Sequence, residues 1–86
     1  MYFTIDYNRS SKHLTVTTHN DQQSAIEDKL ATELRNLEQE INNEVVLLEA
    51  KDYEALQISH TRYFKEAKEI QIQTNNKSNK NPPPQD

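Results

Sequence analysis

Three histidines are the side chains of this sequence that are most suited to metal binding or proton transfer. They are His13, His19 and His60, and no two of them stand at the HxH, HxxxH or HExxH spacing of a zinc site. Along an extended strand His13 and His19 would lie about 20 Å apart, so they cannot share one ion. His60, next to Ser59 and near Arg62, is expected at a helix end rather than as a general base. We therefore expect no metal and no cofactor.

Carboxylates are the other candidates for acid–base chemistry. The available ones are Glu27, Asp28, Glu33, Glu38, Glu40 and Glu44. They fall mainly on the polar face of a predicted helix, whereas a catalytic carboxylate needs a concave, partly desolvated setting. A domain this small leaves little room for a pocket of several hundred Å³. The sequence therefore favours a protein that is not an enzyme, and any enzyme site would have to form at a dimer interface.

The composition excludes several classes of site. The 86 residues include no glycine, so neither a P-loop, nor a dinucleotide-binding fingerprint, nor an EF-hand can form. They include no cysteine, which excludes disulfides, iron–sulfur clusters and thiol nucleophiles. The longest apolar run, residues 45–48, is too short to span a membrane. A soluble, cytoplasmic protein is the expectation that remains.

The chain divides into a folded part and a tail. Residues 75–86, NNKSNKNPPPQD, contain no apolar side chain except three prolines, which predicts a disordered tail. Residues 1–74 are predicted to form one small domain, and a domain of that size is marginally stable on its own. Because no disulfide or metal stabilises it, self-association is the simplest source of further burial, and we expect a homodimer.

Alternating apolar and polar residues predict a β-hairpin from residues 2–7 and 13–19. In the connecting loop, Asn8 is expected to take the left-handed backbone position that glycine usually takes. The polar face of this hairpin is either a solvated sheet face or a binding surface, and it carries Tyr2, Thr4, His13, Thr15 and Thr17.

Apolar residues at helical spacing predict a long amphipathic helix over about residues 21–42. Its start is a capping box at residues 24–27 or an earlier cap at residues 20–23, and Asn42 and Asn43 supply its end in place of glycine. The stripe is expected to pack in the core or to mediate dimerisation, or both, and is too short for a coiled coil. The stripe consists of Ile26, Leu30, Leu34, Leu37 and Ile41.

The second half of the chain predicts two further strands and a less regular helix. Residues 44–50 form an apolar run, typical of a strand that is covered on both faces or flanked by strands on both sides. Asp52 is expected to cap a helix that reaches residue 58 and continues irregularly to residue 68. Residues 69–73 alternate and predict an edge strand. The order ββαβ(α)β indicates an α+β fold, a two-layer sandwich with the long helix across one face of a small sheet.

The charge distribution carries the functional hypothesis. Residues 20–44 hold seven carboxylates and two basic side chains, a net charge of −5. Such an acidic face suits a basic surface on a partner, with fast, salt-sensitive association. We therefore expect a small interaction, regulatory or inhibitor protein that makes no membrane contact. Its small size suits an origin in a phage or other mobile element. It would dock its hairpin face or its acidic helix, through Glu33, Glu38 and Glu40, onto a protein.

A nucleic-acid-associated accessory protein is the alternative hypothesis. Arg62, Lys65 and Lys68 are interleaved with Tyr63 and Phe64, and such a pattern can stack bases and hold phosphates. Two glutamates accompany them, however, and the sequence pI near 5.3 lacks the basic footprint of a nucleic-acid-binding domain.

Overall fold

The computed structural model describes residues 1–75 and confirms the predicted α+β class. The elements are β1 (Tyr2–Asn8), β2 (His13–His19), α1 (Gln22–Glu38), β3 (Glu44–Glu49), α2 (Tyr53–Ser59), α3 (Thr61–Glu66) and β4 (Glu69–Thr74). Their order, ββαβααβ, matches the predicted order. β1 and β2 form the predicted antiparallel hairpin. The predicted tail beyond Asn75 lies outside the described residues.

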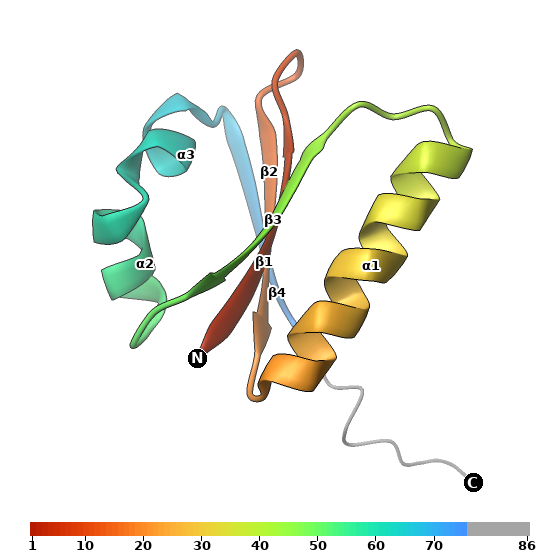
Figure 1. Ribbon diagram of the computed structural model, residues 1–86. Coiled ribbons are helices and arrows are strands. Elements are labelled where there is room, and N and C mark those ends of the chain that lie inside the picture. Colours follow the sequence, from red (N-terminus) through yellow and green to blue (C-terminus); the bar gives the residue numbers. More distant parts are fainter. Residues whose placement is uncertain (76–86) are drawn as a thin grey trace, which may run out of the picture.

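The four strands form one mixed sheet in the order β3-β1-β2-β4. β1 is antiparallel to both β2 and β3, and β4 lies parallel to β2 as the predicted edge strand. Figure 1 shows the sheet edge-on, with α1 on one side and α2 and α3 on the other. The expectation of two layers is therefore wrong. The apolar face of the hairpin is covered by α2 and α3, and its polar face by α1, which makes three layers.

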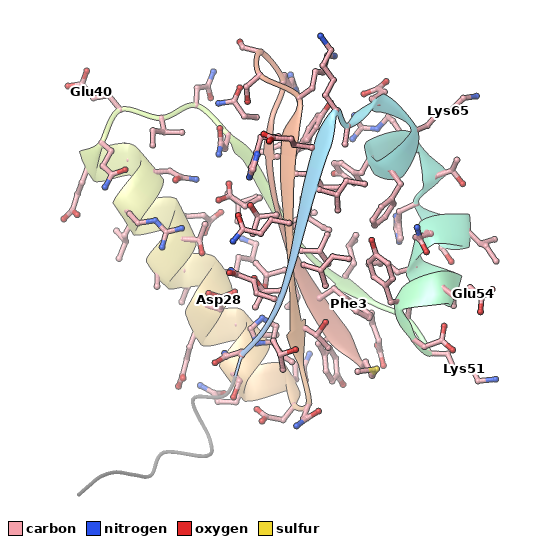
Figure 2. The ribbon with its side chains drawn as sticks, turned by 180° about the vertical axis from the view of Figure 1, so that it is seen from behind. Phe3, Asp28, Glu40, Lys51, Glu54 and Lys65 are labelled. Carbon is pink, nitrogen blue, oxygen red and sulfur yellow. The ribbon has the colours of Figure 1, made fainter. Side chains whose placement is uncertain are left out.

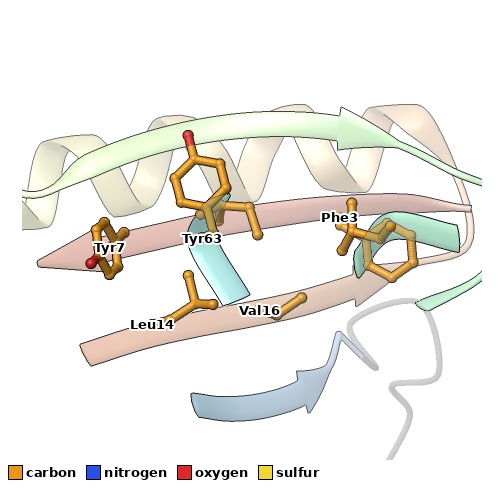
Figure 3. Packing of buried hydrophobic residues seen from close by; sticks show 7 residues of the cluster. Phe3, Tyr7, Leu14, Val16 and Tyr63 are labelled. Carbon is orange, nitrogen blue, oxygen red and sulfur yellow. The ribbon is translucent and has the colours of Figure 1, made fainter. Parts of the chain in front are cut away.

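The hydrophobic core lies between the sheet and the α2–α3 layer. Alternation in β1 and β2 places their apolar side chains on this face, where Tyr63 of α3 covers them (Figure 3). Leu56 of α2 belongs to the same cluster. The rings of Tyr7 and Tyr63 meet edge to face, with centroids 5.8 Å apart. The buried core consists of Phe3, Ile5, Tyr7, Leu14, Val16, Leu56 and Tyr63.

Aspartate side chains cap the N-termini of α1 and α2. Asp21 accepts a hydrogen bond from the Ser24 N–H at 2.8 Å, so α1 begins at the earlier of the two predicted caps. Asp52 caps α2 as predicted, through the Ala55 N–H at 2.8 Å. The irregular continuation after residue 58 is α3, which follows a break at His60.

The left-handed backbone positions are not the predicted ones. Among the described residues, Lys12 (φ 64) and Glu40 (φ 58) have positive φ, and the asparagines do not. Asn8 acts through its side chain instead, whose Oδ1 accepts the N–H groups of Ser10 and Ser11. Glu40 ends α1 in a Schellman motif, because its N–H reaches the Leu37 carbonyl while the next N–H reaches the Asn36 carbonyl.

Replacing Glu40 by glycine is expected to raise the free energy of unfolding by about 0.5–1 kcal/mol, because glycine removes the Cβ clash of a left-handed residue. Urea unfolding of the two proteins measures this difference. The matched control is Asn42→Gly, two residues further along at ordinary φ. That change should lower stability by a similar amount. A loss of stability in both variants would contradict the prediction.

Candidate functional site

The apolar stripe of α1 is exposed, so the expectation that it packs in the core is wrong. Ala25, Thr32 and Asn36 are the α1 residues that are buried. The five stripe residues are instead 37–73% exposed, with Leu37 the most exposed. Together they present on the order of 500 Å² of surface, which is within the usual range of the largest apolar patch on a monomeric protein. We call Ile26, Leu30, Leu34 and Leu37 of the helix, together with Ile41 in the loop that follows it, the α1 stripe.

Glutamates border the α1 stripe on both sides. By the 3.6-residue helical repeat, Glu33 lies on one side, and Glu27 and Glu38 lie on the other. Glu40 follows at the end of the helix, and Lys29 contacts Glu33 at 2.9 Å. The three predicted docking glutamates, Glu33, Glu38 and Glu40, are all exposed. Sequence reasoning thus located the acidic part of this surface, and it did not include the apolar stripe that the glutamates surround.

A layer of hydrogen-bonded polar side chains lies between α1 and the sheet. At one end, His19 is 1% exposed, and its Nε2 lies 2.8 Å from Thr4 Oγ1 and 3.2 Å from Asp28 Oδ2. Its Nδ1 lies 3.0 Å from Asn75 Nδ2. Figure 2 shows Asp28 on the side of α1 that faces the sheet. One buried imidazole therefore joins β1, β2, α1 and the residue that follows β4.

At the other end of α1, Asp6 of β1 holds the helix and the loop that follows it. Its Oδ1 accepts hydrogen bonds from Asn43 Nδ2 at 2.8 Å and from Asn36 Nδ2 at 3.3 Å. Asn8 Nδ2 donates to Asn43 Oδ1 at 2.8 Å. Rotating the leucines onto the sheet would leave these polar groups buried without partners, at about 1–3 kcal/mol for each group. The outward orientation of the stripe follows from this cost.

The polar face of the hairpin is therefore not available for docking. Thr4 is 2% exposed and Thr17 is also buried, because α1 lies over them. Tyr2, His13 and Thr15 are half-buried, and His13 Nδ1 contacts Glu69 Oε1 at 3.1 Å. The expectation of an exposed hairpin face is wrong. The polar side chains of this face pack against the polar side of α1 and are not exposed to solvent.

Two residues of α3, Arg62 and Tyr63, form hydrogen bonds with Glu44. Arg62 donates to Glu44 Oε2 at 3.2 Å, and its guanidinium lies 4.5 Å from the centroid of the Tyr63 ring. Tyr63 is buried in the core, and Phe64 packs edge to face on Tyr53 with ring centroids 5.6 Å apart. The two aromatic side chains that would have to stack on bases are thus engaged within the domain.

Lys65 and Lys68 are exposed, and Lys65 points away from the sheet (Figure 2). Two lysines without an accessible aromatic surface lack the stacking element of a single-strand binding site. The sequence-based nucleic-acid alternative therefore gains no geometric support from this segment.

Glu44 and Tyr63 alter each other's titration. The hydrogen bond from the Tyr63 hydroxyl lowers the pKa of Glu44, and the nearby Arg62 charge lowers it further. Burial raises the pKa of Tyr63 to about 12, and the hydrogen bond to Glu44 acts in the same direction. The Tyr63 hydroxyl therefore stays neutral at pH values well above 10.0, the ordinary pKa of tyrosine. The pair links the start of β3 to α3.

Alkaline titration is expected to show a tyrosinate step near pH 12 that belongs to Tyr63. Because the folded pKa is raised, the stability from this group is complete below pH 10 and is lost as the pH rises toward 12. Near-ultraviolet absorbance measures the step, which should be missing from Tyr63→Phe. The control is Tyr7→Phe, since the buried Tyr7 hydroxyl has no hydrogen-bond partner among the described residues. A step near pH 12 that persists in Tyr63→Phe would contradict the assignment.

Clefts and clusters of ligating side chains are the remaining features of the described residues that bear on catalysis and metal binding. One open cleft of about 650 Å³ lies between the hairpin loop and the loop after α1, and its lining residues are mainly polar. Residues 1–75 contain no cluster of three or more His, Cys, Asp or Glu side chains suited to a metal ion. Within the same range, no helix combines the length and the apolar composition that crossing a membrane requires.

The α1 stripe and its acidic border are therefore the most distinctive surface of the described residues. Comparisons of this chain with protein-family models, with curated proteins and with solved structures gave no match. A signal for the exposed stripe was present in the sequence. The hairpin has only one apolar face, and Ala25, Thr32 and Asn36 form a small and polar row on α1 that suits its polar face.

Proposed function

We propose that this protein is a non-enzymatic interaction module that docks α1 onto a protein partner. The observation that carries the proposal is the exposed α1 stripe on a helix whose opposite side is hydrogen-bonded to the sheet. The largest exposed apolar patch of a soluble protein is often a functional site. The role would be regulatory or inhibitory, in the cytoplasm.

The acidic border defines the chemistry of the partner. Glu33 and Glu38 flank the stripe on opposite sides, so the matching surface is an apolar groove with lysine or arginine side chains on both rims. This is helix-in-groove recognition, in which residues at helical spacing enter the groove as anchors. The charges steer the encounter and set the orientation, and the leucines supply the buried area.

The sheet makes α1 a preformed ligand. Short isolated helices are marginal in water, whereas α1 is held at both ends by polar contacts to Asp6 and His19. A partner therefore binds a helix that is already ordered, so the entropic cost of folding a free peptide does not arise. This supports docking through α1 rather than through a segment that would fold on binding.

The test is capture of a partner from the source cells with wild type and with matched variants. The variant Leu30→Glu/Leu34→Glu should reduce capture of the principal partner at least about a hundredfold, because charge enters the apolar anchor. The control is Ile58→Glu on α2, where an equally exposed aliphatic residue (75%) lies away from the stripe. Circular dichroism verifies that all variants remain folded.

Charge reversal tests the rim separately. Glu33→Lys, Glu38→Lys and Glu40→Lys together should slow association and remove its salt dependence, while leaving the fold intact. Mass spectrometry should identify the captured protein, and the structure of that protein should show an apolar groove with basic side chains on its rims. Capture that is equal in wild type and in the leucine variant would refute docking through α1.

A further inference from the structure

β3 is an edge strand with apolar side chains on both of its faces. Its register with β1 directs Val46 and Leu48 to the core face, and Val45 and Leu47 to the α1 face. Helices lie on both sides of the sheet (Figure 1), which suits a strand with apolar side chains on both faces. In the sheet order β3-β1-β2-β4, however, β3 has β1 on one side only. All four of these side chains are half-buried.

The free edge of β3 carries unpaired backbone groups. Met1 and Ala50 exchange both backbone hydrogen bonds, at 2.9 and 3.1 Å. In an antiparallel ladder the hydrogen-bonded pairs alternate, so the backbone groups of Val46 and Leu48 point to β1. Those of Val45, Leu47 and Glu49 therefore point outward. Residues 44–49 contain no proline, lysine or bulge of the kind that blocks an exposed edge.

We propose that β3 pairs with β3 of a second copy in an antiparallel manner. The two copies are related by a two-fold axis that passes between their Leu47 residues. A two-fold axis perpendicular to the sheet keeps α1 of both copies on one face, so opposed residues must share a face. Leu47 then lies opposite Leu47 of the second copy, and Val45 lies opposite Glu49. These pairs use the outward backbone groups and form one continuous eight-stranded sheet.

The charges on β3 are compatible with this register. Glu49 lies opposite Val45 of the second copy, and Glu44 lies opposite Ala50, so no two glutamates are paired directly. The other edge strand offers a poorer match. β4 alternates isoleucines with Glu69, Gln71 and Gln73, so it is apolar on one face only. β3 is therefore the edge strand on which a further strand would add burial on both faces.

Side-chain burial beside the axis adds to the backbone pairing. Leu37 and Ile41 of the α1 stripe line one small cleft together with Val45. A second copy on the β3 edge would therefore cover the C-terminal end of the stripe as well as Val45 and Leu47. This extra area is needed, because a standard interface takes about 800 Å² from each partner. Ile26 and Leu30, at the other end of α1, stay accessible for docking.

A charge-swap experiment at position 47 tests the pairing. Sedimentation equilibrium of the wild type should give about 20 kDa, twice the chain mass of 10.1 kDa. Leu47→Lys alone and Leu47→Glu alone each place like charges face to face, and should raise the dimer dissociation constant at least about a hundredfold. An equimolar mixture of the two variants should regain the dimer, because Lys then faces Glu across the axis.

Two further measurements separate this pairing from other modes of association. Ile72→Lys, on the β4 edge, should leave the dimer intact, as should Leu30→Glu/Leu34→Glu, which tests docking through α1. Hydrogen exchange at the Val45, Leu47 and Glu49 amides should be slow in the dimer and fast in the monomeric variants. A wild type that stays at 10.1 kDa up to millimolar concentration would overturn the proposal. A dimer that survives Leu47→Lys would also overturn it.

Discussion

Replacing His19 by alanine is expected to lower the free energy of unfolding by roughly 3–5 kcal/mol, the largest loss expected from a single polar substitution in this domain. The imidazole is buried, with polar contacts to Thr4, Asp28 and Asn75 at 2.8–3.2 Å. Its removal opens a cavity and leaves a partly buried carboxylate and two neutral polar groups without this contact. Domains of this length have about 4–11 kcal/mol of stability in total. The variant should therefore be largely unfolded at mild denaturant concentration.

His13→Ala is the matched control for this prediction. Both histidines lie on β2 and point toward the α1 face, but the His13 side chain is 40% exposed and contacts only Glu69 among the ion pairs of the described residues. An exposed ion pair contributes about 1 kcal/mol or less. Urea unfolding followed by circular dichroism measures both losses. Equal losses for the two variants would contradict the role assigned to the His19 contacts.

The second large effect separates two leucines that the sequence alone would treat alike. Leu56→Ala is expected to cost roughly 2–5 kcal/mol, because Leu56 is fully buried and its removal leaves a cavity in the core. Leu34→Ala should change stability by less than about 0.5 kcal/mol, because that side chain is mostly exposed. Both residues lie on helices and have the same chemistry, so burial alone accounts for the difference.

Denaturant midpoints at low protein concentration measure this contrast, with association kept to a minimum. Leu30→Ala is a second exposed position that should repeat the Leu34→Ala result. If Leu34→Ala destabilised the domain as much as Leu56→Ala, the α1 stripe would be part of the core. The outward orientation of α1, and with it the proposed docking surface, would then be wrong.

The strands were predictable because their signal is local. In β1 and β2 every second residue is apolar, and this period fixes both the strand and the face that enters the core. The caps of α1 and α2 were predictable for the same reason, since Asp21 and Asp52 bond to N–H groups three residues further along. The glutamates of the acidic border followed from charge and helical spacing.

The orientation of α1 was not predictable in the same way. A helix with an apolar stripe normally turns it inward, and the periodicity of Leu30, Leu34 and Leu37 carries no information about which sheet face it will meet. The apolar face of the hairpin is occupied by Leu56 and Tyr63, so α1 meets the polar face. This outcome depends on competition between distant segments, which local patterns do not report.

The left-handed positions depended on turn geometry rather than residue preference. Asparagine is the better residue for positive φ, yet Lys12 and Glu40 take these positions. The four-residue hairpin loop and the Schellman motif each require a positive φ at one fixed place. Whichever residue stands at that place adopts a positive φ, even where its side chain disfavours that conformation.

The carbonyl of Lys12 has a consequence for the order of folding. It accepts the N–H groups of Lys68 and Glu69 at 2.8 and 3.3 Å, and thereby joins the hairpin loop to the start of β4. This contact spans more than 50 residues, whereas the hairpin itself closes locally within microseconds. β4 is therefore expected to dock late, because a long loop must close first. Until it docks, the outer edge of β2 stays open, so the half-folded chain is most exposed to aggregation at β2 and to proteolysis in the undocked β4 segment.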